Sequence, residues 1–151
     1  ASVYGFETSI QRQLGKYFGI YLNHTFTKSS TTGIEGREGD DLQLPGTAEN
    51  MFNASLSFEN KKLVVRVSLN YASDYLDEIG GENFEDRYYD TQTFLDINAS
   101  YAFTPKWRLF LEANNLTNQP LRYYQGIQSR TMQSEFYNAR YNFGLKFDLF
   151  D

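Results

Sequence analysis

The stretch ARYNFGLKFDLF (139–150) alternates strictly between apolar positions and polar or bare ones. Successive side chains of a β-strand point to opposite faces, so this pattern predicts a strand with one apolar and one polar face. The apolar face of such a strand must contact either a protein core or lipid. The apolar set is Ala139, Tyr141, Phe143, Leu145, Phe147 and Leu149, and the other set is Arg140, Asn142, Gly144, Lys146 and Asp148.

Other segments repeat this alternation over about ten residues or more, longer than the ~5–6 residues of most globular strands. No segment sustains a 3.6-residue period, so we expect almost no helix. The pattern predicts an all-β fold, an antiparallel meander of about seven long strands. The predicted strands are 3–13, 17–28, 50–59, 62–74, 91–104, 106–117 and a last strand that begins near Ser134 and ends at Phe150.

The connections between these strands alternate in length. The segments 14–16, 60–61 and 105 are minimal turns, whereas 29–49, 75–90 and 118–133 are long and polar and are expected to be loops. Compact domains rarely contain repeated structureless loops of more than ~12–15 residues. Short turns at one end and long loops at the other are typical of outer-membrane β-barrels.

Composition and the position of aromatic residues favour lipid as the contact of the apolar face. No window approaches 18 apolar residues, which excludes a transmembrane helix but not a membrane barrel, where every second residue is polar. Aromatic residues make up 17% of the chain and flank the aliphatic positions of the stripes, as in interfacial girdles. Phe18 and Phe26 flank Ile20 and Leu22, for example. A soluble sandwich or a lipocalin-like barrel is the alternative.

Charge and residue usage exclude several other functions. The formal net charge is -5 and no basic cluster is present, which argues against nucleic-acid binding. The chain has no cysteine, so it forms neither disulfides nor a thiolate metal site. His24 is the single histidine and lies on an apolar stripe, which leaves little material for a catalytic triad. We expect no cofactor and no enzyme activity.

Three stretches resemble TonB-dependent outer-membrane receptors. LPGTAENMFNASLSFE (44–59) is similar to a strand entry of that family, and WRLFLEANNLTNQPLRYYQG (107–126) is similar to its penultimate strand with the Asn-Leu-Thr-Asn signature. NARYNFGLKFDLF (138–150) resembles the final strand and its C-terminal barrel-assembly signal. Asp151 follows Phe150, whereas the family usually ends on an aromatic residue. The signal residues are Asn142, Gly144, Phe147, Leu149 and Phe150.

The resemblance implies a larger protein. The family barrel has about 22 strands around a plugged lumen, so residues 1–151 would be its C-terminal segment, without the plug and the N-terminal strands. An odd number of strands that begins at the extracellular side agrees, because a complete barrel has an even number. We therefore expect one edge of the last strand to be unpaired within this chain.

The function that the resemblance implies is TonB-dependent uptake of a scarce nutrient, a siderophore, cobalamin or a glycan, across a Gram-negative outer membrane. The implied partners are outer-membrane lipid, the remaining barrel and plug, the TonB complex through the missing N-terminal part, and the barrel assembly machinery. A soluble all-β binding module, such as a carbohydrate-binding domain, is the alternative, and it would purify without detergent.

Two sets of residues in the long connections are candidates for binding. Tyrosine and arginine in the last connection can stack on a ligand or hydrogen bond to it, and packing within the loop is the alternative. Carboxylates near Gly80 and Gly81 can hold Ca²⁺, but their spacing fits no EF-hand, and a solvated acidic surface is favoured. The ligand candidates are Arg122, Tyr123, Tyr124, Gln125 and Arg130, and the calcium candidates are Asp77, Glu78, Glu82, Glu85 and Asp86.

Overall fold

The computed structural model describes residues 1–149, which form eleven strands and one short 3₁₀ turn. No helix among these residues is long and apolar enough to cross a membrane. The elements are β1 Ser2–Leu14, β2 Phe18–Ser30, β3 Asn50–Glu59, β4 Leu63–Ala72, β5 Tyr75–Glu78, η1 Asn83–Glu85, β6 Arg87–Tyr89, β7 Gln92–Ala102, β8 Trp107–Asn114, β9 Leu121–Gln125, β10 Ile127–Glu135 and β11 Arg140–Phe147.

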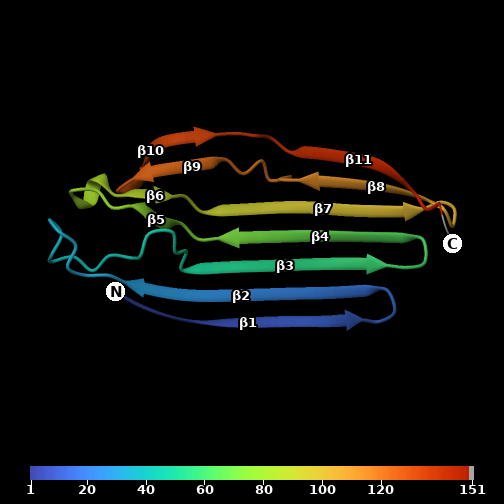
Figure 1. Cartoon of the computed structure of the whole chain (residues 1–151), viewed down its shortest axis with the longest axis horizontal. Helices are drawn as coiled ribbons and strands as arrows, with labels where there is room; N and C mark the ends of the chain where they lie inside the picture. The colour runs from blue at the N-terminus through green and yellow to red at the C-terminus, as the bar shows by residue number, and fades with distance from the viewer. Residues whose placement is uncertain (150–151) are drawn as a thin grey trace.

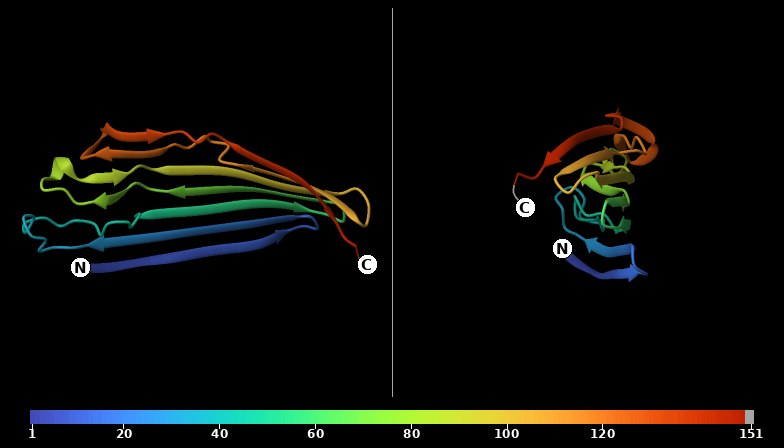
Figure 2. Two further views of the ribbon diagram at one scale, coloured as in Figure 1. Left: turned by 45° about the horizontal axis from the view of Figure 1, so that its top comes forward. Right: turned by 90° about the vertical axis from the view of Figure 1, so that its right-hand side faces the viewer.

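Seven long strands form one antiparallel sheet in the order β1-β2-β3-β4-β7-β8-β11, which we call the wall sheet. Strands that follow each other along the wall pair as neighbours, so the predicted meander is confirmed. The short turns lie at the end of the sheet near the C-terminus, and the long connections lie at the opposite end, near the N-terminus (Figure 1). Viewed nearly end-on, the sheet is curved into an arc (Figure 2, right).

The register of the wall sheet aligns the apolar stripes of all seven strands on one face. Leu22 lies opposite Ala54, Ala54 opposite Leu69, and Leu69 opposite Leu95. The other face carries polar rows, because a strand's side chains alternate between faces. One such row runs across five strands and consists of Ser57, Arg66, Asn98, Glu112 and Asn142.

The apolar stripe is not buried in a closed core. None of nine apolar residues along the stripes of β3, β4, β7, β8 and β11 is buried, which agrees with a lipid contact and not with a soluble sandwich. His24 interrupts the stripe, but its Nε2 lies 3.2 Å from the Asn50 side-chain oxygen and its ring packs edge-on against Phe6. Leu56, Leu109, Leu111, Leu145 and Phe147 are exposed, and Phe52, Val65, Leu69 and Ile97 are half-buried.

The long connections 75–90 and 118–133 are not structureless, so the expectation of loops there was wrong. They contain a second antiparallel sheet of four strands in the order β10-β9-β6-β5, which we call the loop sheet. Tyr75 pairs with Tyr89 and Tyr89 with Tyr123, while Leu76 pairs with Tyr88 and Tyr88 with Tyr124. The strands β5, β6 and β9 escaped prediction because three to five residues are too few to show a period.

The last wall strand begins later than predicted. Ser134 and Glu135 belong to β10, where they pair with Arg122 and Leu121, and β11 starts only at Arg140. Asn138 between them has a φ of 61°, in the left-handed region that asparagine tolerates better than most residues. The segment at Asn138 separates β10 from β11, which the alternation pattern had predicted as one continuous strand.

Both outer edges of the wall sheet are unpaired within the described residues. β11 pairs only with β8, and β1 pairs only with β2. The expectation that one edge of the last strand stays open is therefore confirmed for Arg140–Phe147. Open edges expose unpaired backbone N–H and C=O groups, which hydrocarbon cannot satisfy.

Candidate functional site

The first candidate site lies where the long connections meet. Arg37, in the 31–49 connection, is buried and donates to both carboxylate oxygens of Asp86, at 2.9 and 3.1 Å. It also donates to the Gly80 carbonyl at 2.9 Å, and Gly80 N–H donates to Asp86 at 2.9 Å. The bond to Asp86 raises the pKa of Arg37 further, so the guanidinium stays charged. This clamp fixes the 31–49 connection to the connection between β5 and β6.

A second set of contacts joins the wall sheet to the loop sheet. Asn115 and Asn118 both have positive φ values and form a tight turn directly after β8. The Gln119 side chain donates to the Thr91 carbonyl at 3.0 Å and accepts from the Thr93 N–H at 3.0 Å. The side chain of Gln119 thus makes the hydrogen bonds to Thr91 and Thr93 that the backbone of a neighbouring strand would otherwise make at the start of β7. Thr117 of the Asn-Leu-Thr-Asn signature also donates to the Thr93 carbonyl at 2.7 Å, so the signature and Gln119 together join the two sheets.

Aromatic side chains cover both faces of the loop sheet. On one face, the ring of Tyr89 lies 5.5 Å from that of Tyr75 and 4.8 Å from that of Tyr123. On the other, Tyr88 stacks on Tyr124 with the rings 5.1 Å apart. Desolvation by burial is the main cause that raises the pKa of Tyr75, Tyr88, Tyr89 and Tyr124. These rings therefore stay neutral under physiological conditions and serve as packing surfaces and hydrogen-bond donors.

The structure brings the five predicted ligand residues together on β9 and β10. Tyr124 is buried and donates to Asp74, and Arg122 binds Asp90 and Thr131. The remaining three are less enclosed. Gln125 accepts from Arg130 at 3.2 Å, Arg130 lies over the Phe84 ring at 5.8 Å, and the Arg87 guanidinium lies 5.4 Å from the Tyr123 ring.

The predicted calcium residues do not come together as a ligand set. Asp77 and Glu78 pair with Arg87 at 2.6 and 2.9 Å, and Asp86 is held by Arg37. Glu82 and Glu85 lie exposed at the ends of η1. Within residues 1–149, no three histidine, cysteine or acidic side chains converge to hold a metal ion.

The residues of the predicted assembly signal lie on β11 and just beyond it. Asn142 donates to Glu112 at 3.3 Å, and Phe147 packs on Trp107 with the ring centroids 4.6 Å apart. Gly144 lies beneath the Phe110 ring, where a Cβ atom would come within 2.4 Å of a ring carbon. Leu149 is exposed after the strand, and Phe150 lies outside the described residues.

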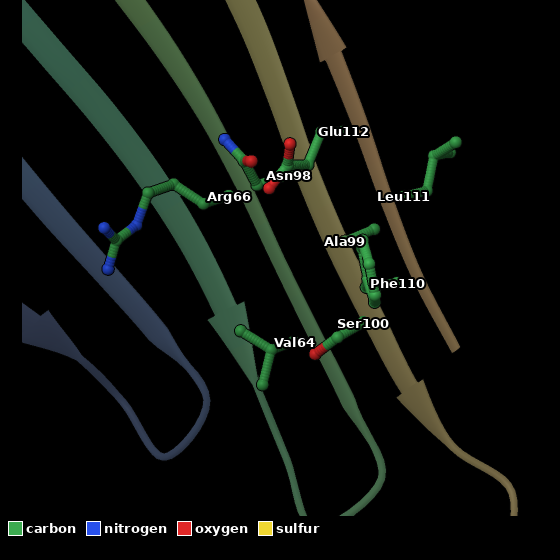
Figure 3. Close-up of a pocket in the computed structure, with 8 residues that line it drawn as sticks. All are labelled: Val64, Arg66, Asn98, Ala99, Ser100, Phe110, Leu111 and Glu112. Carbon is green, nitrogen blue, oxygen red and sulfur yellow. The ribbon is translucent and has the colours of Figure 1, made fainter. Parts of the chain in front are cut away.

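The second candidate site is a shallow cavity of about 290 Å³ on the polar face of the wall. Arg66, Asn98 and Glu112 extend from β4, β7 and β8 around it, with Phe110 at its border (Figure 3). Among residues 1–149, no ion pair engages Arg66 or Glu112. The cavity therefore offers a cation, an amide and a carboxylate side by side to whatever lies against this face.

Sequence reasoning missed the residues that organise the loops. The sequence pattern did not mark Arg37 at all, and Gln119 was included only as one letter of the stretch 107–126. Arg37 was the single basic residue among the acidic residues of 31–49, which is the one signal that could have marked it. Its partner Asp86 is 49 residues away, and local spacing carries no information about such a pair.

Comparisons with known proteins agree with this geometry. The chain is 27% identical, over 124 residues, to the iron-regulated outer membrane virulence protein of two Vibrio cholerae strains. The match covers 82% of this chain but only 19% of the relative, so the chain spans about a fifth of that protein's length. Its fold is similar to a solved variant of the ferric enterobactin receptor of Pseudomonas aeruginosa, with a TM-score of 0.66 and 16% identity, over 96% of this chain and 22% of that one.

The family assignment rests on most of the sequence. Residues 1–116 match the family described as TonB dependent receptor-like, beta-barrel. The apolar stripe and the alternation of short and long connections are the features expected of such a barrel. The chain therefore belongs to the TonB-dependent receptor β-barrel family and is a protein of the Gram-negative outer membrane.

Proposed function

We propose that residues 1–151 form the C-terminal segment of the barrel of a TonB-dependent outer-membrane receptor that imports a ferric siderophore. The observation that carries the proposal is the wall sheet, with one apolar face and two open edges, because only further strands can satisfy those edges in a membrane. The similar proteins, an iron-regulated outer membrane virulence protein and a ferric enterobactin receptor, support iron as the cargo.

The polar face supports a second part of the proposal, contact with the plug of the same protein. Arg66 and Glu112 have no ionic partner among the described residues and border the same cavity. Charged groups on a face that is closed off by protein require partners. We assign these partners to the plug. In this proposal, the TonB complex binds the N-terminal part of the receptor. The barrel assembly machinery binds the C-terminal signal on β11.

Ligand contact from this segment is assigned to the accessible members of the predicted set. Arg130 is exposed, and Tyr123 and Gln125 are half-buried, whereas Tyr124 and Arg122 are occupied in holding the loop sheet together. Arg130→Ala and Tyr123→Ala are each expected to weaken ligand binding about tenfold in the full-length receptor. The matched control is Phe136→Ala, an exposed aromatic between β10 and β11.

The transport proposal is tested in a strain from which the full-length receptor gene is deleted. We expect loss of radioactive iron uptake from one or more ferric siderophores, restored by the receptor on a plasmid. Loss of cobalamin or glycan use with iron uptake intact would show that the cargo is wrong. Unchanged uptake of all three classes would contradict transport itself.

A further inference from the structure

Lysines mark the short-turn end of the wall sheet. The turns 15–17, 60–62 and 103–106 contain Lys16, Lys61, Lys62 and Lys106, and the one acidic residue that directly flanks them is Glu59 at the end of β3. All four lysines are exposed. Within residues 1–149, no carboxylate lies in ion-pair range of Lys16, Lys61 or Lys62. The opposite end is acidic, so the basic turns are a local feature of a chain with a net charge of -5.

An aromatic belt lies directly beside these lysines. Phe58 packs against Tyr17 and Phe18, with ring centroids 5.9 and 5.2 Å apart, and Lys16 Nζ lies 5.3 Å from the centre of the Tyr17 ring. Arg12 lies opposite Ile20 and so shares the apolar face near the same turn. Aromatic rings gather at the boundary between hydrocarbon and headgroups. The lysines therefore lie at the level of the headgroups.

A depression in the apolar face begins just inside this belt. Ala54 on β3 lies between Leu22 on β2 and Leu69 on β4, and its short side chain leaves a hollow of about 390 Å³. The other apolar side chains around the hollow are Ile20, Leu56 and Val67. Lys16 lies on the turn that precedes β2, and Lys61 and Lys62 lie on the turn that follows β3.

The distance between lysines and hollow fits one lipid molecule. At about 3.3 Å per residue, the hollow lies roughly 13–23 Å along the strands from Lys16 and Lys62. A strand tilt of about 40° reduces this to roughly 10–18 Å of depth. One leaflet with its headgroups is about 20–22 Å thick. The hollow is therefore at the depth of an acyl chain whose headgroup lies at the lysines.

We propose that β2, β3 and β4 hold one anionic phospholipid of the periplasmic leaflet. Lys16, Lys61 and Lys62 bind its phosphate-bearing headgroup, and the hollow over Ala54 takes one acyl chain. Charge complementarity selects an anionic headgroup over a zwitterionic one. The proposal requires only the membrane location of the barrel and is independent of the imported ligand.

Native mass spectrometry of the detergent-solubilised full-length receptor tests the site with phosphatidylglycerol and phosphatidylcholine of equal chain length. We expect the receptor to retain phosphatidylglycerol at least about tenfold better than phosphatidylcholine. Each lysine near an anionic headgroup strengthens binding about fivefold at low salt. K16Q/K61Q/K62Q should bring the two lipids close to equal retention. Ala54→Leu should lower retention of both lipids and leave their ratio unchanged.

Matched controls separate this site from general effects. Lys28→Gln removes an exposed lysine at the other end of β2, and Ala99→Leu enlarges a side chain on the same apolar face outside the hollow. Both should retain lipid like the unchanged receptor, and K61R/K62R should keep the selectivity. Equal retention of both lipids by the unchanged receptor, or full selectivity in K16Q/K61Q/K62Q, would overturn the headgroup assignment. Unchanged retention in Ala54→Leu would overturn the acyl-chain assignment.

Discussion

The wall sheet and the loop sheet are both antiparallel β structure, but different interactions stabilise them. The wall buries few side chains, and its apolar stripe is completed by lipid rather than by protein. The loop region contains most of the buried residues among residues 1–149, including Leu76, Tyr124, Arg37 and Asp86. The wall therefore depends on its ladder of backbone hydrogen bonds and on the surrounding lipid, and the loops depend on specific side-chain pairs.

The largest expected effect separates the two faces of the wall. Leu111→Arg places a charge on the lipid face and should cost about 2–4 kcal/mol of unfolding free energy near the bilayer midplane. Ser68→Arg, on the polar face of β4 opposite Asp96 and outside the cavity, should cost much less. Denaturant unfolding of the full-length receptor in liposomes measures both. Similar costs for the two variants would contradict the assignment of faces.

The next effect is confined to the loops. Asp86→Asn removes the charge that binds buried Arg37 and should loosen the 31–49 connection while the wall stays folded. We expect cleavage of that connection by added protease to rise on the order of tenfold, because hydrogen bonds between charged groups are the strong ones. Asp41→Asn, in the same connection but outside the clamp, is the control. A fall in wall stability of the same size would show that the two regions are not independent.

A smaller effect is expected at the joint between the two sheets. Gln119→Leu removes the side-chain bonds to Thr91 and Thr93 and should cost about 1 kcal/mol locally. Amide hydrogen exchange should rise at Thr93 and through β6 and β9, with β2 and β3 unaffected. Gln128→Leu, in an exposed position, should change none of these rates. If exchange at Thr93 stays the same, Gln119 does not serve as the joint.

The smallest effect concerns a side-chain contact within the wall itself. Gly144→Ala forces the Phe110 ring to move, because the new Cβ would lie 2.4 Å from a ring carbon. The ring can rotate away, so we expect a loss of no more than about 1 kcal/mol. Unfolding of Gly144→Ala/Phe110→Ala should match that of Phe110→Ala alone. A further loss from the glycine change in that background would mean that Gly144 is required for a reason other than the ring.

The wall could be predicted from the sequence because its rule is local. Every second residue of a long strand must suit lipid, so the stripe from Tyr141 to Leu145 shows its face without knowledge of its neighbours. The same rule located the short turns, whereas the open edge of β11 was expected only from the resemblance to a larger barrel. The rule overextended the last strand because Ser134 and Glu135 continue the alternation in a strand of the other sheet.

The candidate site was only partly predictable. The sequence indicated Arg122, Tyr123 and Tyr124 as a group, and the structure does place them on one strand, β9. It could not indicate that Tyr124 binds Asp74, at a separation of 50 residues. Loop packing of this kind depends on which distant segments come into contact. The alternation of apolar and polar residues contains no information about those contacts.

The amino-acid sequence by itself determined the number of wall strands, their apolar face and the ends at which they turn, because lipid and water impose those choices residue by residue. Only the tertiary structure decided that the long connections form a second sheet and that Arg37 joins two of them through Asp86. It also decided that Ala54 and two lysine-bearing turns border the same strip of the membrane face. These features arise when segments far apart in the chain come into contact, and their energies exist only in that arrangement.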